Sequence, residues 1–245
     1  MDEFIAVDEA PRGGLEGLGR LPAIDERSHY SRYAMAAPQT TLAFRNWLSP
    51  RWQEWPRVLD QGGTSECVAY SATKFLLTHP IVNRPQESCN SFYKRCQQID
   101  EWPGEDYDGT SVNASMKILK QDGLISGYTW AFEMEPVRRH VLEIGPVCVG
   151  TDWTIDMFTP DRWGYIWPTG AAAGGHAYLI IGASNRRNNP DGSKGAFRII
   201  NSWGPKWGPH NGRAWISYGV MEKLIRGLGK WPGEAAAPVE VQLPR

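Results

Sequence analysis

Three short stretches of the sequence carry residues suited to nucleophilic chemistry. A glycine-bearing turn beginning at Gln61 delivers Cys67 to the start of a helical pattern, where unpaired N–H groups and the positive end of the helix dipole favour a thiolate. His176 follows two glycines at the start of an apolar strand, and Asn201 stands at the end of another predicted strand. A thiol needs a base and an imidazole needs a partner that holds its ring. These residues could therefore form one nucleophilic site if their segments meet in space.

The elements that must position these residues fall into two groups. Apolar periodicity predicts four helices, over residues 67–78, 90–98, 112–121 and 135–144. Ser65 is expected to cap the first of them. After Gly145 the pattern changes to short β-rich segments, over residues 146–151, 163–168, 176–183, 197–203 and 214–218. Helices first and strands afterwards indicate an α+β protein with a helical lobe and a sheet lobe.

The same patterns predict the domain organisation. Residues 1–50 carry Gly, Pro and Ala clusters without sustained periodicity, and we expect them to form an extended N-terminal arm. Residues 51–232 are the predicted folded domain, with a helical lobe at about 58–140 and a β lobe at about 141–232. Residues 233–245 are expected to be a loose C-terminal tail.

Composition and charge argue against several classes of partner. The 245 residues include 26 basic and 27 acidic side chains, and the net charge of −1 gives no electrostatic reason to expect nucleic acid or an anionic membrane. No stretch approaches the roughly 18 apolar residues of a membrane span, and the N-terminus is acidic where a secretion signal would be basic. This pattern predicts a cytoplasmic protein.

The remaining cysteines and histidines are expected to be structural. Four cysteines in a chain of this length do not make a disulfide scaffold, so we expect reduced thiols. Cys89, Cys96 and Cys148 have no His or Cys at zinc-ligand spacing, and neither a metal nor an organic cofactor is implied. Surface positions are expected for the other histidines, His29, His79, His140 and His210.

Taken together, the three stretches resemble the motifs of the papain-like cysteine peptidases, the C1 family. Gln61 and Cys67 have the six-residue separation of that family, GGHAYLIIGA is similar to its histidine strand, and NSWGPKWGPHNGRAWI is similar to its asparagine segment. The order Cys, His, Asn also matches, and the resemblance covers roughly residues 55–220. It implies a papain-like fold, with a helical left lobe, an antiparallel β-barrel-like right lobe and an active cleft between them.

The resemblance also implies a role for each residue of the site. By that match Cys67 is the nucleophile, His176 the general acid and base, and Asn201 the residue that orients the imidazole. Gln61 would donate to the oxyanion beside the Cys67 N–H. Trp203 resembles the tryptophan that shields the His–Asn hydrogen bond, and it would also line the substrate cleft.

Substrate-binding positions follow from the same resemblance. Gly109 and Thr110 would hydrogen-bond the substrate backbone. The S2 pocket would receive the second side chain before the scissile bond, and its walls would be Ser111 and Val112 on one side and Gly150, Gly175 and Ala177 on the other. Small wall residues predict a roomy, apolar pocket, with filling of the space by a loop as the alternative.

Two departures from the family pattern bear on activity and origin. The usual first cysteine and following tryptophan are absent, and Glu66 precedes the nucleophile. A carboxylate within about 4–6 Å would raise the thiol pKa, but an outward orientation of Glu66 is the favoured alternative. The short run Gly19-Arg20-Leu21-Pro22, with Asp25-Glu26-Arg27 after it, is similar to the lead-in of bacterial and phage-type members, which favours a microbial or viral origin.

The function that these observations favour is that of a cysteine endopeptidase acting on a peptide or protein. Two alternatives stay open: a papain-like fold retained as a structural or binding component of a phage particle, and a transpeptidase or cell-wall amidase using the same chemistry. Under the first alternative the protein would have a virion or another assembly as its partner and would be virion-associated rather than free in the cytoplasm.

Overall fold

One long strand, β5 (Ala172–Asn188), separates two hydrophobic cores in this computed structural model. Successive side chains of a strand point to opposite faces. Ala177, Leu179 and Ile181 accordingly face the core of the helical lobe. Tyr178 and Ile180 face the core of the sheet lobe. The structure describes residues 15–22, 52–54, 57–80, 85, 87–102, 104 and 106–238.

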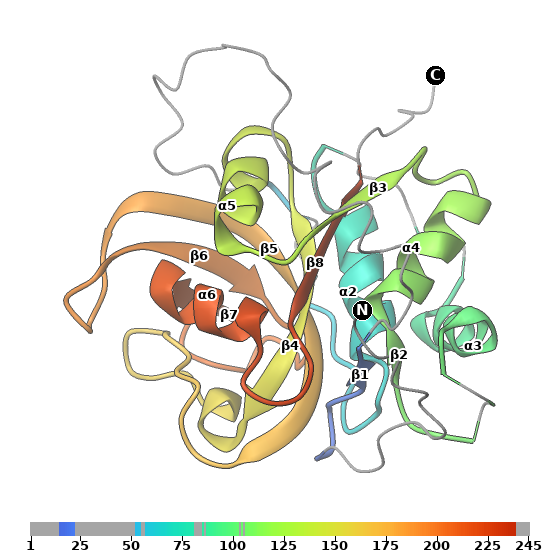
Figure 1. Cartoon of the computed structure of the whole chain (residues 1–245), viewed down its shortest axis with the longest axis horizontal. Coiled ribbons are helices and arrows are strands. Elements are labelled where there is room, and N and C mark those ends of the chain that lie inside the picture. Colours follow the sequence, from blue (N-terminus) through green and yellow to red (C-terminus); the bar gives the residue numbers. More distant parts are fainter. Residues whose placement is uncertain are drawn as a thin grey trace, which may run out of the picture.

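The helical lobe is built from α2 (Cys67–Leu76), α3 (Cys89–Ile99) and α4 (Val112–Gln121), as Figure 1 shows. The sequence predicted each of them, with ends that differ by at most two residues. Because α2 packs against α3 and α4 on one side and β5 on the other, nearly all of its side chains are buried. The predicted cap at Ser65 was wrong. Glu66 is the N-cap residue, and its side chain makes no capping hydrogen bond.

The sheet lobe contains a six-stranded antiparallel sheet in the order β3-β8-β4-β5-β6-β7. Its other strands are β3 (Tyr128–Ala131), β4 (Val147–Thr154), β6 (Lys194–Ile200), β7 (Arg213–Ser217) and β8 (Glu234–Pro238). Two helices pack on it, α5 (Met134–Glu143) and α6 (Tyr218–Arg226), and a 3-10 turn, η2 (Ile155–Phe158), follows β4. Within the described residues the sheet is open and does not close into a barrel. The α+β, two-lobe expectation is confirmed.

The expectation of a loose tail from residue 233 was wrong for β8. This strand lies inside the sheet, between β3 and β4, and Ala235, Ala236 and Ala237 are fully buried. Alanine has weak β-propensity, so the pattern did not predict a strand. Small side chains are needed here because β8 contributes to both hydrophobic cores. Residues 239–245 lie outside the described residues.

The predicted strand over 163–168 was also wrong. This stretch forms a turn, joined to β7 by a single bridge between Tyr165 and Trp215. The Asp161 carboxylate accepts hydrogen bonds from the backbone N–H groups of Trp163 and Tyr165 and from the indole of Trp167. These bonds hold the chain in a turn, which the aromatic composition of the stretch did not reveal.

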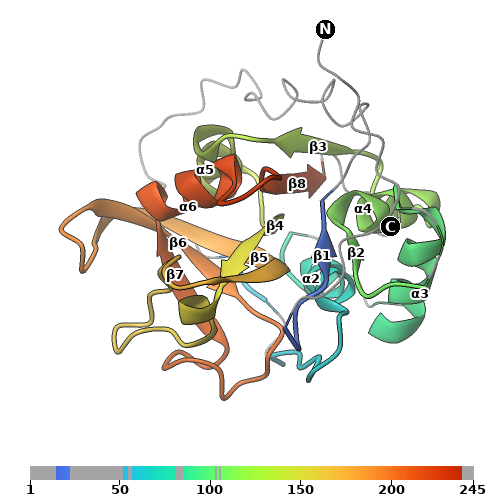
Figure 2. The same ribbon diagram turned by 60° about the horizontal axis from the view of Figure 1, so that its bottom comes forward.

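A short strand from the N-terminal arm lies between the lobes. β1 (Arg20–Leu21) pairs in parallel with β2 (Thr110–Ser111), and Figure 2 shows it between the helices of one lobe and the sheet of the other. The remainder of the predicted arm, residues 1–14 and 23–50, lies outside the described residues, as does His29. Residues 15–22 are called the N-terminal segment below.

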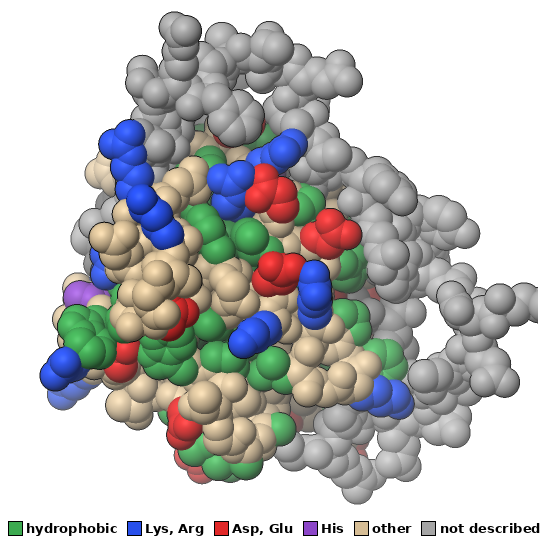
Figure 3. All heavy atoms as spheres, turned by 60° about the vertical axis from the view of Figure 1, so that its left-hand side comes forward, with side chains coloured by type: hydrophobic (Ala, Val, Ile, Leu, Met, Phe, Trp, Pro, Cys, Tyr) green, Lys and Arg blue, Asp and Glu red, His purple; other side chains and the backbone are tan. Residues whose placement is uncertain are grey.

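Three further expectations from the sequence concern membrane-spanning helices, surface charge and the positions of the histidines. Among the described residues, no helix combines the length and apolar character needed to cross a bilayer. On the face shown in Figure 3, acidic and basic side chains are interspersed. The expected surface position of His140 was wrong, because this residue of α5 is buried.

Candidate active site between the lobes

Cys67 and the strand that carries His176 meet at the boundary between the two cores. The Cys67 side chain is fully buried at the first turn of α2, and its Sγ accepts a hydrogen bond of 3.4 Å from the backbone N–H of Ala177. Burial raises the pKa of the Cys67 thiol to about 12, against the smaller lowering effects of this hydrogen bond and of the Arg20 charge. The thiol is therefore protonated in this state, although it opens a helix.

The imidazole of His176 is held by Asn201. Nε2 of His176 lies 2.8 Å from Oδ1 of Asn201, which also accepts the backbone N–H of Ser202 at 2.8 Å. An oxygen that only accepts places the ring proton on Nε2 and leaves Nδ1 as the basic nitrogen. Nδ1 has no hydrogen-bond partner among the described residues. Burial lowers the pKa of His176 to about 4, opposed by the hydrogen bond to Asn201.

Aromatic rings enclose this imidazole. Trp203 stacks on His176 with ring centroids 4.6 Å apart and an interplanar angle of 26°. Trp153, a buried residue of β4, meets the His176 ring edge-on at 4.7 Å. Phe158 stacks in turn on Trp203 at 5.0 Å. The sequence motifs pointed to Trp203. Trp153 and Phe158 lie outside those motifs and were missed.

Gln61 is tied to the asparagine segment by Ser202. The Gln61 side chain accepts a hydrogen bond of 2.5 Å from the Ser202 hydroxyl through Oε1, and its Nε2 donates to the Thr64 carbonyl at 2.5 Å. The Gln61 backbone N–H also donates to the Ser202 carbonyl. An amide nitrogen carries two N–H groups, so one remains for a further acceptor. Ser202 stands inside the NSWG motif, but no role was predicted for it.

Glu66 lies neither against the thiol nor in solvent. Its side chain is buried, and Oε1 accepts a hydrogen bond of 2.6 Å from Asn90 of α3. The favoured outward orientation was therefore wrong. The Asn90 amide binds the carboxylate, and burial rather than Glu66 is the main cause of the raised Cys67 pKa.

The N-terminal segment fills the cleft above Cys67. Gly19 bridges the lobes: its N–H donates to the Gly175 carbonyl at 3.0 Å, and its carbonyl accepts the Thr110 N–H at 2.9 Å. The Trp203 indole donates to the Gly17 carbonyl at 3.1 Å. A Cβ on Gly19 would overlap the Ser65 carbonyl oxygen, so only glycine allows this close approach.

The predicted substrate-binding positions are brought together around this segment. Gly109 lies so close to the Gly19 carbonyl that a Cβ there would overlap it, and Thr110 pairs with the segment. Ser111 caps α4 by accepting the Ala114 N–H, while Ala177 contacts the thiol. The other three predicted wall residues, Val112, Gly150 and Gly175, gather around the Arg20 side chain.

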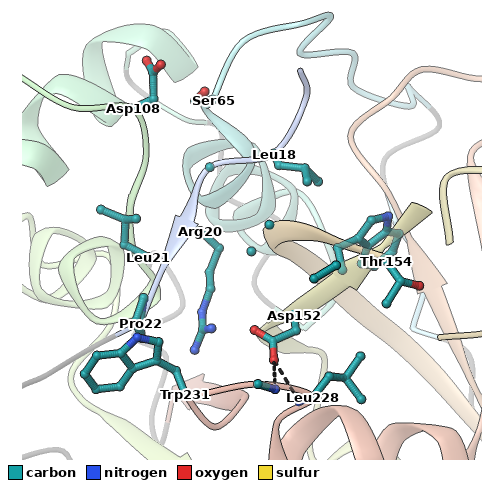
Figure 4. Close-up of a pocket in the computed structure, with 16 residues that line it drawn as sticks. Leu18, Arg20, Leu21, Pro22, Ser65, Asp108, Asp152, Thr154, Leu228 and Trp231 are labelled. Atoms are coloured by element: carbon teal, nitrogen blue, oxygen red, sulfur yellow. Dashed lines mark hydrogen bonds between the residues drawn. The ribbon is translucent and has the colours of Figure 1, made fainter. Parts of the chain in front are cut away.

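The prediction of an apolar pocket was wrong. Arg20 fills the space between those walls, and its guanidinium pairs with Glu234 of β8 at 3.0 Å. Beside the segment remains a cavity of about 280 Å³, shown in Figure 4, into which Arg20 extends between Trp231 and Asp152. Glu234 was missed in the sequence analysis, because this residue lies 214 positions from Arg20 and belongs to none of the motifs.

The described cysteines form no disulfide, and the described residues form no metal site. All four cysteines are free, as expected from the sequence. Within the described ranges, no three His, Cys, Asp or Glu side chains gather in a way that could hold a metal ion.

Comparisons with known proteins agree with this architecture. No protein-family model and no curated protein matches the sequence significantly. Xylellain, a cysteine protease from Xylella fastidiosa, matches with a TM-score of 0.64 at 17% identity over 96% of this chain and 99% of its own. Bromelain from Ananas comosus, in complex with the E64 inhibitor, matches with a TM-score of 0.54 at 15% identity over 77% and 98%.

A third solved structure is that of the ragweed pollen cysteine protease Amb a 11 in its proform. It matches with a TM-score of 0.57 at 17% identity, over 89% of this chain and 74% of its own. Such low identities establish likeness of fold alone. With helical and sheet lobes arranged as in these three structures, the chain has the fold of the papain-like cysteine proteases.

Proposed function

We propose that this protein is a cysteine peptidase held latent by its own N-terminal segment. The observation that carries the proposal is the hydrogen bond between His176 and Asn201 beside the buried Cys67, at the junction of the lobes. The three compared structures are described as cysteine proteases, which supports the same class of chemistry for this chain.

In the proposed reaction Cys67 attacks the carbonyl carbon of a peptide bond. His176 takes the thiol proton at Nδ1 and passes it to the leaving amine, so that a thioester and a free amine form. His176 then takes a proton from water, and the resulting hydroxide hydrolyses the thioester. The backbone N–H of Cys67 and the second N–H of Gln61 Nε2 stabilise the oxyanion in both steps. Asn201 keeps the imidazole in the required tautomer.

Latency is supported by how the segment sits. Cys67 and His176 are both fully covered, and burial shifts their pKa values away from a thiolate–imidazolium pair. Among the described residues, no carbonyl of the N-terminal segment accepts a hydrogen bond from Gln61 Nε2 or from the Cys67 N–H. The segment therefore covers Cys67, but it does not place one of its own peptide carbonyls at the oxyanion donors, where the thiol could attack it. The ragweed protease offers a parallel, since its structure is described as a proform.

Opening the cleft in the full-length chain tests the proposal. Gly19→Val places a side chain against Ser65 and should displace the segment. We expect iodoacetamide to alkylate Cys67 at least ~100-fold faster at pH 7 than in the parent, because a rehydrated thiol returns toward its ordinary pKa. Hydrolysis of fluorogenic peptides should appear together with this reactivity. Gly127→Val is the matched control, since a Cβ at Gly127 meets no atom of the described part of the chain within 4 Å.

Two cysteine variants separate the proposed chemistry from its alternatives. Cys67→Ala in the Gly19→Val chain should lower kcat by at least ~10³-fold, whereas Cys148→Ala, which removes another fully buried thiol, should leave hydrolysis intact. Reactive Cys67 without hydrolysis of any peptide would count against a peptidase and in favour of a binding protein. Transfer to an added amine in place of water would point to a transpeptidase.

A further inference from the structure

Arg20 is held in the cleft by contacts that suit a guanidinium. Its Nε and one terminal nitrogen lie 3.1 and 3.0 Å from Oε1 of Glu234, and that terminal nitrogen also donates to the Pro232 carbonyl at 2.9 Å. Both charged side chains are almost completely buried, with 2% and 3% exposed. A buried charge pair persists only where geometry and additional hydrogen bonds offset desolvation, and here both conditions are met.

The walls of the pocket fit the stem of this side chain. A Cβ on Gly150 would lie 2.9 Å from Cγ and Nε of Arg20 and 2.9 Å from a methyl group of Val112. Glycine at this position therefore leaves the width that an arginine stem requires, and Val112 supplies an apolar side. The pocket accepts an extended side chain and places its charged end at Glu234.

The charged residues that line the surrounding cleft also favour a basic side chain in this pocket. Among the described residues that line the cavity in Figure 4, Arg20 is the one basic side chain, and Asp108 and Asp152 are acidic. When the N-terminal segment leaves, Arg20 leaves with it. The cleft then retains Asp108, Asp152 and Glu234, and it offers a negative field to an incoming peptide.

We propose that the pocket occupied by Arg20 is a subsite for a substrate arginine, and that Glu234 is the residue that selects it. This inference rests on the proposed peptidase function and adds its substrate class, peptides with a basic residue near the scissile bond. Arg20 is then an internal stand-in for the substrate side chain. A leucine would offer no donor to Glu234 or to the Pro232 carbonyl, so an apolar peptide forfeits both interactions.

The test uses the full-length Gly19→Val chain and fluorogenic peptides in which arginine or leucine occupies each of the three positions before the scissile bond. We expect arginine to raise kcat/KM roughly tenfold to a hundredfold at one position, and Glu234→Gln to abolish that ratio. Glu234→Asp, which keeps the charge, should retain part of it. The matched control is Glu54→Gln, which removes another buried carboxylate paired with an arginine, Arg213, and should retain the full ratio.

The outcomes separate this inference from the proposed function. Hydrolysis without an arginine preference, or with a preference that Glu234→Gln retains, overturns the subsite and leaves the peptidase standing. If no peptide is hydrolysed, the peptidase is rejected, and the subsite is judged by protection of Cys67 from iodoacetamide by arginine and leucine peptide amides. Protection that favours arginine and depends on Glu234 supports the subsite, and equal or absent protection overturns it. If Gly19→Val does not fold, Arg20→Ala vacates the pocket and takes its place.

Discussion

Ser202 is the residue that joins two parts of the proposed catalytic machinery. Its backbone N–H donates to the same Asn201 oxygen that faces His176, and its hydroxyl donates to Gln61. The side chain that holds the imidazole and the side chain that would hold the oxyanion are thus oriented through one serine. Ser202 acts by positioning them, since it contacts neither the thiol nor the imidazole through its hydroxyl.

Removing this hydroxyl should impair the chemical step without affecting the nucleophile. In the Gly19→Val chain, we expect Ser202→Ala to lower kcat roughly tenfold, because Gln61 loses the bond that fixes its amide, while alkylation of Cys67 is unchanged. Ser202→Thr keeps a hydroxyl and should restore most of the rate. Ser71→Ala is the control, because the Ser71 hydroxyl is buried but makes no hydrogen bond with any described residue. Equal kcat in Ser202→Ala and Ser71→Ala would refute the positioning role.

Two buried histidines should make the fold sensitive to acid. Burial lowers the pKa of both His140 and His176 to about 4, whereas in the unfolded chain each titrates near 6.5. Below pH 6.5 the unfolded state therefore binds more protons, and the free energy of unfolding falls as the pH falls from 6.5 toward 4.

The His140 contribution can be isolated by urea unfolding at pH 7 and pH 4.5. We expect His140→Leu to lose about 1–3 kcal/mol less stability over this interval than the parent chain, since it removes one of the two titrations. His79→Leu, at an exposed position, should behave as the parent does. Identical losses in the parent and in His140→Leu would show that His140 is not buried as a neutral ring.

The candidate site could be predicted where residue types stand in short motifs. Gln61, Cys67, His176 and Asn201 lie in such stretches, and the structure brings all four to one place. Arg20 and Glu234 could not be paired in advance, because their contact joins the two ends of the described chain and neither residue type is unusual in its own stretch. The pKa shifts of Cys67 and His176 depend on the segment that covers them, which local sequence does not encode.

At the scale of elements, β8 shows where patterning fails. Four helices, α2 to α5, were predicted within two residues because their apolar positions repeat with a helical period, whereas α6 was missed. β8 consists of a glutamate, three alanines and a proline, and it is a strand because β3 and β4 pair with it on both sides. Its neighbours, and not its own propensity, determine its conformation.

Enlarging one of these alanines should destabilise the fold. Ala236 has no exposed surface and lies in the helical-lobe core, so Ala236→Val adds volume where packing leaves none. We expect the free energy of unfolding to fall by about 1–3 kcal/mol, measured by urea denaturation. Ala172→Val, at the exposed start of β5, should change it by less than about 0.5 kcal/mol. A tolerated Ala236→Val would mean that β8 is held as loosely as its composition suggested.

At the scale of the whole molecule, the N-terminal segment acts as a brace between the lobes. Gly19 hydrogen-bonds to both of them, Leu18 packs into the core of the sheet lobe, and Leu21 packs with Trp102 and Trp231. The Trp102 indole also donates to the Pro22 carbonyl. The cleft that a peptidase needs is therefore closed by the same contacts that hold the two lobes together.

Opening the cleft should consequently cost stability. Gly19→Val displaces Leu18 and Leu21, each of which buries apolar surface worth about 1.5–3 kcal/mol, and the freed chain regains conformational entropy. We expect a net loss of about 2–4 kcal/mol in the free energy of unfolding by urea denaturation, together with the gain in Cys67 reactivity. An arginine peptide that occupies the vacated pocket should return part of that loss, because it binds the folded state alone, whereas the matching leucine peptide should return less. Gly127→Val controls for the substitution itself. A Gly19→Val chain that becomes reactive at unchanged stability would show that the segment covers the site without bracing the lobes.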